Sequence, residues 1–149
     1  MLTQTLRPLF ARDLAKLRNE LALYKNEQNI WLVGAGITNP AGNLCLHLVG
    51  NLNTYIGAEL GKTGYIRHRD LEFSLKDVPL EELLAKIDAT ALVVDEALAA
   101  LTDEQLAEEY PAEVFVGKTM TNGYFLVHLA MHLSYHLGQV NYHRRLLDK

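Results

Sequence analysis

The sequence predicts an all-α fold and, within that class, a four-helix bundle. Two segments carry apolar residues at alternating steps of three and four, which is the period of a helix with one buried face. Two further segments, residues 28–58 and 119–143, contain no Asp, Glu, Lys or Arg, and charge-free helices are normally buried. No segment has a convincing strand pattern, and a length of 149 residues suits one domain spanning residues 1–149.

The first two helices are predicted in the N-terminal part of the chain. The first is expected from about residue 6 to 28, on the spacing of its apolar residues: Phe10, Leu14, Leu17, Leu21 and Tyr24. The second is expected from Pro40 to about Leu60, because Asn39 suits the N-cap position and Pro40 the first turn.

The other two long helices are predicted after a long connection. Pro79 precedes the third, whose apolar residues keep the helical spacing: Leu80, Leu84, Ile87, Ala91, Val94, Leu98 and Leu101. The fourth is expected from about Asn122 to Leu147, and basic residues at its end suit the helix dipole. Thr102 and Gln105 have the spacing of a capping box and predict a short turn between these helices. The connection over residues 61–78 is long for helices that double back and predicts a crossover or a lid.

Composition excludes several classes of protein. The chain has 14 basic and 18 acidic side chains, and the scattered basic residues argue against nucleic acid as a partner. Charged residues precede any apolar run near the N-terminus, so we expect no signal sequence and a cytoplasmic location. Both charge-free segments mix Gly, Asn, Thr and His among their apolar residues, which argues against a membrane span. Cys45 is the single cysteine, and we expect it to pack in the core.

The histidines are the candidate functional residues, because all except His68 lie in the two charge-free segments. His128, His132 and His136 recur at intervals of four residues. Each such step advances about 40° around a helix and about 6 Å along it, so neighbours in this series can share one metal ion. The outer two are about 12 Å apart and cannot easily do so. Spacing alone therefore allows either a 128–132 pair or a 132–136 pair.

A third ligand has to come from another helix, and His47 is the histidine of the other charge-free segment. Three neutral imidazoles that leave positions open to water are typical of a catalytic metal site. Cys45 lies about 200° around the helix from His47 and is not expected to bind the same ion. Haem held between His47 and a later histidine is an alternative, whereas the Glu-x-x-His pairs of a di-iron bundle are absent. Hydrogen-bonded core histidines are a further alternative, and for His128 and His143 individually this remains the expectation.

Residues 43–73 and 128–145 resemble the DinB-like superfamily, which consists of small four-helix bundles, many of them metal-dependent enzymes. The family's H-x-x-x-H before Gly-Gln matches His132 and His136, and its histidine on the second helix matches His47. The resemblance covers nearly the whole chain, and it implies that these three histidines are the ligands. The N-x-C-x-H and YIRHRD segments indicate a particular branch of the superfamily.

The resemblance also implies a divalent ion, nickel or zinc, and a homodimer. Superfamily members with assigned activities include hydrolase-like proteins and transferases or isomerases that use low-molecular-weight thiols such as mycothiol or bacillithiol. The residues that define a thiol substrate are not recognisable in this chain.

Three residues are candidates to support the metal ligands. Asn51 lies one turn beyond His47 on the same face, so its amide can orient a ligand or bond a neighbouring helix. His128 and Gln139 lie near the predicted ligands on the last helix.

Three other residues are candidates to contact a substrate. Arg67 and Arg69 lie in the long connection and would suit an anionic substrate, although pairing with Asp70 or Glu72 is the more common outcome. Trp31 is expected either at the pocket or at a subunit interface.

The sequence therefore predicts a metal-dependent enzyme that acts on a small molecule. Hydrolysis is expected first, with no catalytic residue beyond the ion and its water identified. A thiol-dependent transferase or isomerase with a thiol cosubstrate is the second hypothesis. A nonenzymatic metal-binding or interaction bundle is the third.

Overall fold

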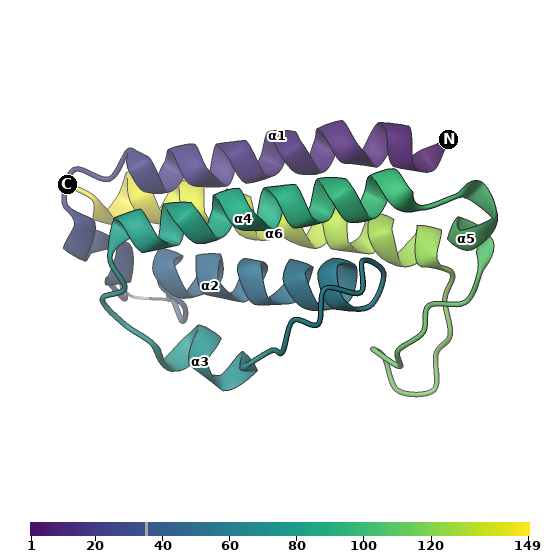
Figure 1. Ribbon diagram of the computed structural model, residues 1–149. Helices are drawn as coiled ribbons and strands as arrows, with labels where there is room; N and C mark the ends of the chain where they lie inside the picture. Colours follow the sequence, from purple (N-terminus) through teal and green to yellow (C-terminus); the bar gives the residue numbers. More distant parts are fainter. Residues whose placement is uncertain (35) are drawn as a thin grey trace.

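The protein is a helical bundle in the computed structural model, which describes residues 1–34 and 36–149. Four long helices form the bundle (Figure 1): α1 (Leu2–Ala22), α2 (Ala41–Leu52), α4 (Leu80–Ala100) and α6 (Asn122–Leu147). Three short helices connect them: η1 (Glu27–Trp31), α3 (Arg69–Ser74) and α5 (Asp103–Ala107). A π-helical turn, Asn53–Ala58, continues α2. The described residues contain no strand, only an isolated bridge between Glu109 and Thr121.

The four long helices run in two opposite directions. In Figure 1, α1 and α6 run one way while α2 and α4 run the other. The segment after α2 therefore runs back along the bundle before α4 begins, and it carries α3 against α2. This placement of α3 puts residues from the long connection next to the buried helix α2.

The core lies where the four long helices meet. Phe10, Leu17 and Leu21 of α1 are 0–1% exposed, as are Leu48 of α2 and Phe125 of α6. In α2 every residue except Val49 is buried, which explains why this segment carries no charge. None of the helices in residues 1–34 and 36–149 contains an apolar stretch that could span a lipid bilayer.

The expected bounds of the first helix were wrong. It spans Leu2–Ala22 rather than 6–28, and a separate 3₁₀ turn follows. The Asn26 side chain accepts a hydrogen bond from the Gln28 amide and so caps that turn. The Asp148 carboxylate accepts hydrogen bonds from the amides of Lys25 and Asn26, which holds the chain out of the helix.

The other helices lie close to their predicted positions. α6 has the predicted bounds, and Thr102 and Gln105 form the predicted capping box at the start of α5. Asn39 was expected to cap α2, but Pro40 occupies the N-cap position and no side chain caps this helix. The expected regular helix up to Leu60 changes to a π-helical turn after Leu52.

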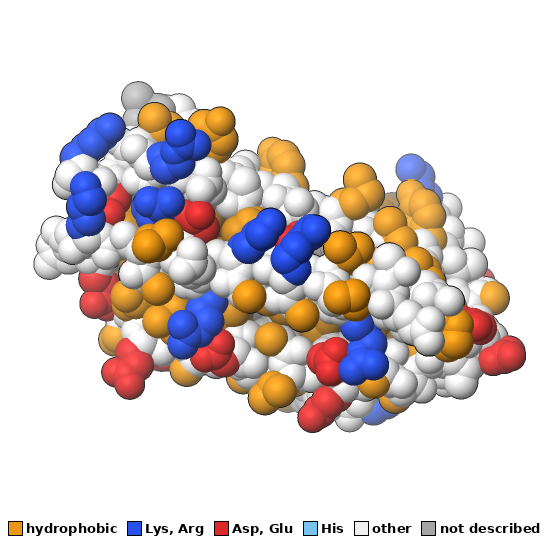
Figure 2. All heavy atoms as spheres, turned by 90° about the horizontal axis from the view of Figure 1, so that it is seen from above, with side chains coloured by type: hydrophobic (Ala, Val, Ile, Leu, Met, Phe, Trp, Pro, Cys, Tyr) orange, Lys and Arg blue, Asp and Glu red, His pale blue; other side chains and the backbone are white. Residues whose placement is uncertain are grey.

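Charges are mixed over the face formed by α1 and α4. Figure 2 looks onto α1 and shows acidic and basic side chains interspersed with apolar ones. Arg7 pairs with Asp95 and Arg18 with Asp88, each at 2.8 Å between α1 and α4. This face therefore carries no continuous basic patch of the kind that binds nucleic acid.

Candidate metal centre

Three histidine side chains from two helices converge on one point. His47 comes from the middle of α2, and His132 and His136 come from successive turns of α6. His132 Nε2 lies 3.2 Å from His47 Nε2 and 3.1 Å from His136 Nε2. One nitrogen from each ring lies within 4.8 Å of the other two. Among the described residues, this is the group of side chains whose geometry can hold a metal ion.

In two of the rings, the hydrogen bond made by Nδ1 determines which nitrogen carries the proton and which keeps a lone pair for the centre. His47 Nδ1 lies 3.0 Å from Glu72 Oε1, and an ionised carboxylate can only accept, so Nδ1 donates the proton. His136 Nδ1 donates likewise to Gln139 Oε1 at 2.7 Å. In their neutral forms both rings therefore present the Nε2 lone pair toward the centre.

The spacing of the nitrogens fits a shared ion. Nitrogens about 2.1 Å from one ion and about 90–109° apart are separated by about 3.0–3.4 Å. The two separations at His132 Nε2, 3.2 and 3.1 Å, lie inside this range. Two lone pairs aimed at a common point repel each other unless a cation or a proton lies between them. The donor set thus suits a divalent cation with affinity for imidazole nitrogen.

Burial keeps the imidazoles of His132 and His136 neutral. It is the main cause that lowers the pKa of His132 to about 4, and the neighbouring His136 and His47 lower it further. Burial also lowers the pKa of His136, although the hydrogen bond to Gln139 opposes this shift. Neutral rings at pH 7 are the form that binds metal, so no proton has to be displaced first from these two residues.

Glu72 of α3 joins the connection over residues 61–78 to the histidine cluster through its contact with His47. Arg67 donates two hydrogen bonds to its carboxylate, at 2.8 and 2.9 Å, and His47 donates a third. Burial raises the pKa of Glu72, but the hydrogen bonds from His47 and Arg67 outweigh burial and the pKa lies below its usual value. The carboxylate is therefore ionised, and it fixes the orientation of His47.

Asn43 of α2 holds α3 in position. The amide of the buried Asn43 donates to the carbonyl oxygens of Glu72 and Leu75 at 2.9 and 2.8 Å. Asn43 lies one turn before His47, so α2 positions both the ring and the segment that supports it.

Glu72 is the functional residue that the sequence analysis missed, because it was considered only as a partner for a loop arginine. Metal-binding histidines usually donate their second ring proton to a carboxylate or carbonyl oxygen. A search for an acidic residue able to support His47 would have pointed to the long connection, but local spacing does not choose between Asp70 and Glu72.

The three predicted supporting residues have different surroundings. Gln139 bonds His136, as described above. Asn51 is buried one turn from His47, and its Oδ1 has no hydrogen-bond partner among the described residues. His128 lies one turn before His132 in α6, and its ring stacks on Phe125 at 5.7 Å between centroids.

The three residues predicted to contact a substrate each contact another part of the protein. Arg67 lies beside the centre, but its guanidinium binds Glu72. Arg69 lies over the ring of Phe73. Trp31 is 9% exposed and packs on Gly42, where an added Cβ would lie 2.5–2.7 Å from its ring. Contact of these three residues with a substrate stays a prediction.

A cavity of about 440 Å³ opens beside the centre. His136 and Gln139 line it together with Tyr135 and Tyr142 of the same helix and Asn39 from the segment before α2. Its volume lies within the range of about 300–1,000 Å³ that small-molecule sites occupy. The ring of His136 is thus within reach of a small molecule.

The fold and the site together define the class of protein: a four-helix bundle with a three-histidine cluster that can hold a metal ion. Comparison with protein families identifies the particular family. The model of the DinB superfamily matches residues 11–140, and the chain belongs to this superfamily. Comparisons with curated proteins and with solved structures found no match.

Proposed function

We propose that the protein is a metal-dependent hydrolase that acts on a small substrate. His47, His132 and His136 hold one divalent ion, zinc or nickel, and leave positions for water and substrate. Such an ion lowers the pKa of a bound water toward about 7 and polarises a carbonyl oxygen. The observation that carries the proposal is the convergence of three Nε2 atoms, with separations of 3.2 and 3.1 Å at His132.

The protein's own side chains orient the ligands and limit access to them. Glu72 keeps the His47 proton on Nδ1, and Gln139 does the same for His136. Phe73 packs against the His47 ring at 5.1 Å between centroids and shields this side of the centre from water. The cavity beside His136 leaves that ring open to water or a small molecule.

Metal content tests the first step of this proposal. The protein is purified without a nickel column, and bound metals are measured for wild type and for His132→Ala. We expect one divalent ion per chain in wild type and a strong loss in the variant. His68→Ala is the matched control, because His68 is exposed and lies outside the cluster. Negligible metal in both wild type and His132→Ala would contradict the proposal.

Turnover tests the second step. Small esters and amides are offered to the chelator-stripped protein and to protein reloaded with zinc or nickel. We expect hydrolysis only in the reloaded protein, and none with His132→Ala. Turnover that requires an added low-molecular-weight thiol would favour the transferase hypothesis instead. Retained metal without turnover of either kind would favour a nonenzymatic bundle.

A further inference from the structure

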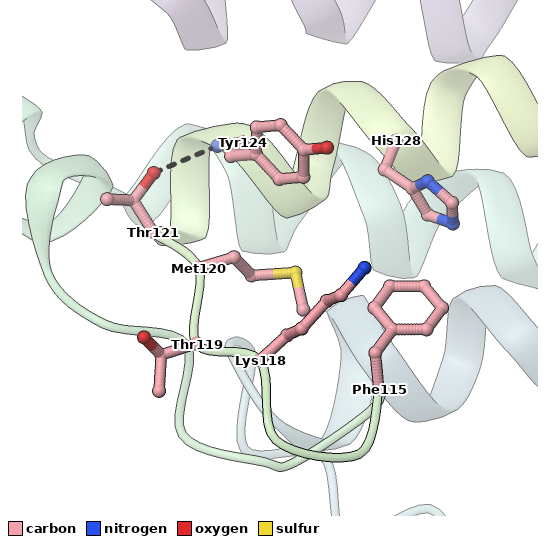
Figure 3. Close-up of a pocket in the computed structure, with 7 residues that line it drawn as sticks. All are labelled: Phe115, Lys118, Thr119, Met120, Thr121, Tyr124 and His128. Atoms are coloured by element: carbon pink, nitrogen blue, oxygen red, sulfur yellow. Dashed lines mark hydrogen bonds between the residues drawn. The ribbon is translucent and has the colours of Figure 1, made fainter.

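A second cavity, of about 490 Å³, lies between the start of α6 and the loop that precedes it. We call it the His128 pocket. Figure 3 shows Phe115 and Lys118 reaching from the loop toward Tyr124 and His128 of α6, with Met120 between them. The volume is that of a site for a drug-sized molecule.

The lining combines apolar surface with a single positive charge. Phe115, Met120 and Tyr124 contribute apolar surface to its walls, and Tyr124 is 66% exposed. Lys118 is the basic residue of the lining, and no carboxylate in residues 1–34 and 36–149 pairs with its ammonium group. In Figure 3 its Nζ extends toward the end of the pocket where His128 and Phe115 lie. The charge is therefore at one end and the apolar surface extends away from it.

The charged end of the pocket adjoins the metal centre. His128 lies one helical turn before His132, a rise of about 6 Å. Its ring stacks on Phe125, which packs edge-on against Tyr55 at 5.2 Å between centroids. Arg67, which binds Glu72, lies over the Tyr55 ring at 5.6 Å. A continuous layer of side chains thus joins the pocket to the residues that support the histidine cluster.

We propose that the His128 pocket binds an organic anion with an aromatic or aliphatic body. The charged group of the ligand lies beside Lys118 at the His128 end, and the body packs against Phe115, Met120 and Tyr124. That this ligand is the substrate rests on the proposed function, but its binding does not require the metal.

A matched pair of dyes tests the pocket on the metal-stripped protein. Anilinonaphthalene sulfonate carries an aromatic body and an anionic group, and N-phenylnaphthylamine has the same body without the charge. We expect Lys118→Met to weaken binding of the sulfonate about three- to fivefold and to change binding of the neutral dye less than about twofold. Phe115→Ala should weaken binding of both dyes by about tenfold. Phenylpropionate, an aromatic carboxylate, should displace the sulfonate.

Lys16→Met on the exposed surface of α1 is the control, and it should leave both dissociation constants unchanged. Circular dichroism verifies that each variant is folded. Unchanged dye binding in both Lys118→Met and Phe115→Ala would overturn the proposal, because the dyes would then occupy another site. This result is independent of the metal measurement, so a failure of the metal centre and a failure of the pocket are distinguished.

Discussion

Glu72 occupies the space into which a side chain at Gly50 would project. A Cβ built on Gly50 would lie 2.6 Å from Glu72 Cδ and closer still to Oε2. Gly50 lies three residues after His47 in α2, on the same face of the helix. The absence of a side chain there lets the carboxylate reach the imidazole, so the glycine is part of the support of the centre.

Gly50→Ala should therefore damage both the fold and metal binding. Arg67 and His47 hold the Glu72 carboxylate, so it cannot move aside without losing these hydrogen bonds. We expect a loss of about 1–3 kcal/mol in the free energy of unfolding, as for other overpacked sites. Urea denaturation and a metal titration measure the two effects.

Gly138→Ala is the matched control for this substitution. Gly138 also lies inside a helix, but apart from its chain neighbours and the adjacent helix backbone no atom lies within 4 Å of its added Cβ. We expect this variant to be more stable than wild type by up to about 1 kcal/mol, because alanine has the higher helix propensity. Similar destabilisation by both substitutions would show that space beside Glu72 is not the reason for Gly50.

Glu72→Gln should weaken metal binding without removing it. The amide can still accept a hydrogen bond from His47, but it no longer provides the negative charge that strengthens the ring as a ligand. We expect the dissociation constant for zinc to rise about 10- to 100-fold with one ion still bound at saturation. Competition with a chromophoric chelator measures this. Glu82→Gln, which removes an exposed carboxylate near Lys86, should leave the affinity unchanged.

The sequence predicted the histidine cluster better than its support. The absence of charge in two segments predicted the two helices that carry the cluster, but spacing alone left the 128–132 and 132–136 pairs open, and the resemblance to the DinB-like superfamily chose between them. The expectation that both charge-free helices are buried was right for α2 and wrong for α6, where Met131 is 68% and Tyr135 66% exposed. The position of Glu72 depends on how the connection after α2 runs back along the bundle, and no local pattern contains that path.

The end of α1 could not be predicted for a similar reason. The apolar spacing continues to Tyr24, which is buried, although the helix has already ended at Ala22. Asp148 holds the backbone of Lys25 and Asn26 from the other end of the chain. An interaction across more than a hundred residues leaves no trace in the local pattern of apolar residues.

Cys45→Ala should leave metal binding unchanged, whereas His47→Ala should reduce it strongly. Cys45 is fully buried, and burial raises the pKa of its thiol to about 12, so the thiolate is absent at pH 7. Metal analysis of the two variants tests the difference. As a second check, Ellman's reagent should react slowly with native protein and rapidly after denaturation. An equal loss of metal in both variants would contradict the assignment of these residues to different helix faces.

His143 should make the stability of the protein depend on pH. His143 is 3% exposed; its Nε2 donates to the Leu32 carbonyl oxygen at 2.8 Å, and its Nδ1 accepts from the Tyr24 hydroxyl at 2.7 Å. Burial lowers the pKa of His143 below the ordinary value of 6.5, although the hydrogen bond to Leu32 opposes this shift. Below about pH 6.5 the unfolded chain therefore binds a proton that the folded protein does not, and the free energy of unfolding falls as the pH falls. One such group contributes a slope of at most about 1.4 kcal/mol per pH unit.

Urea denaturation of metal-stripped wild type and His143→Gln between pH 7.5 and 5.5 should give a shallower pH dependence of the free energy of unfolding in the variant. The buried histidines of the cluster remain in both proteins, so equal slopes would show that His143 is protonated as readily in the folded state as in the unfolded chain.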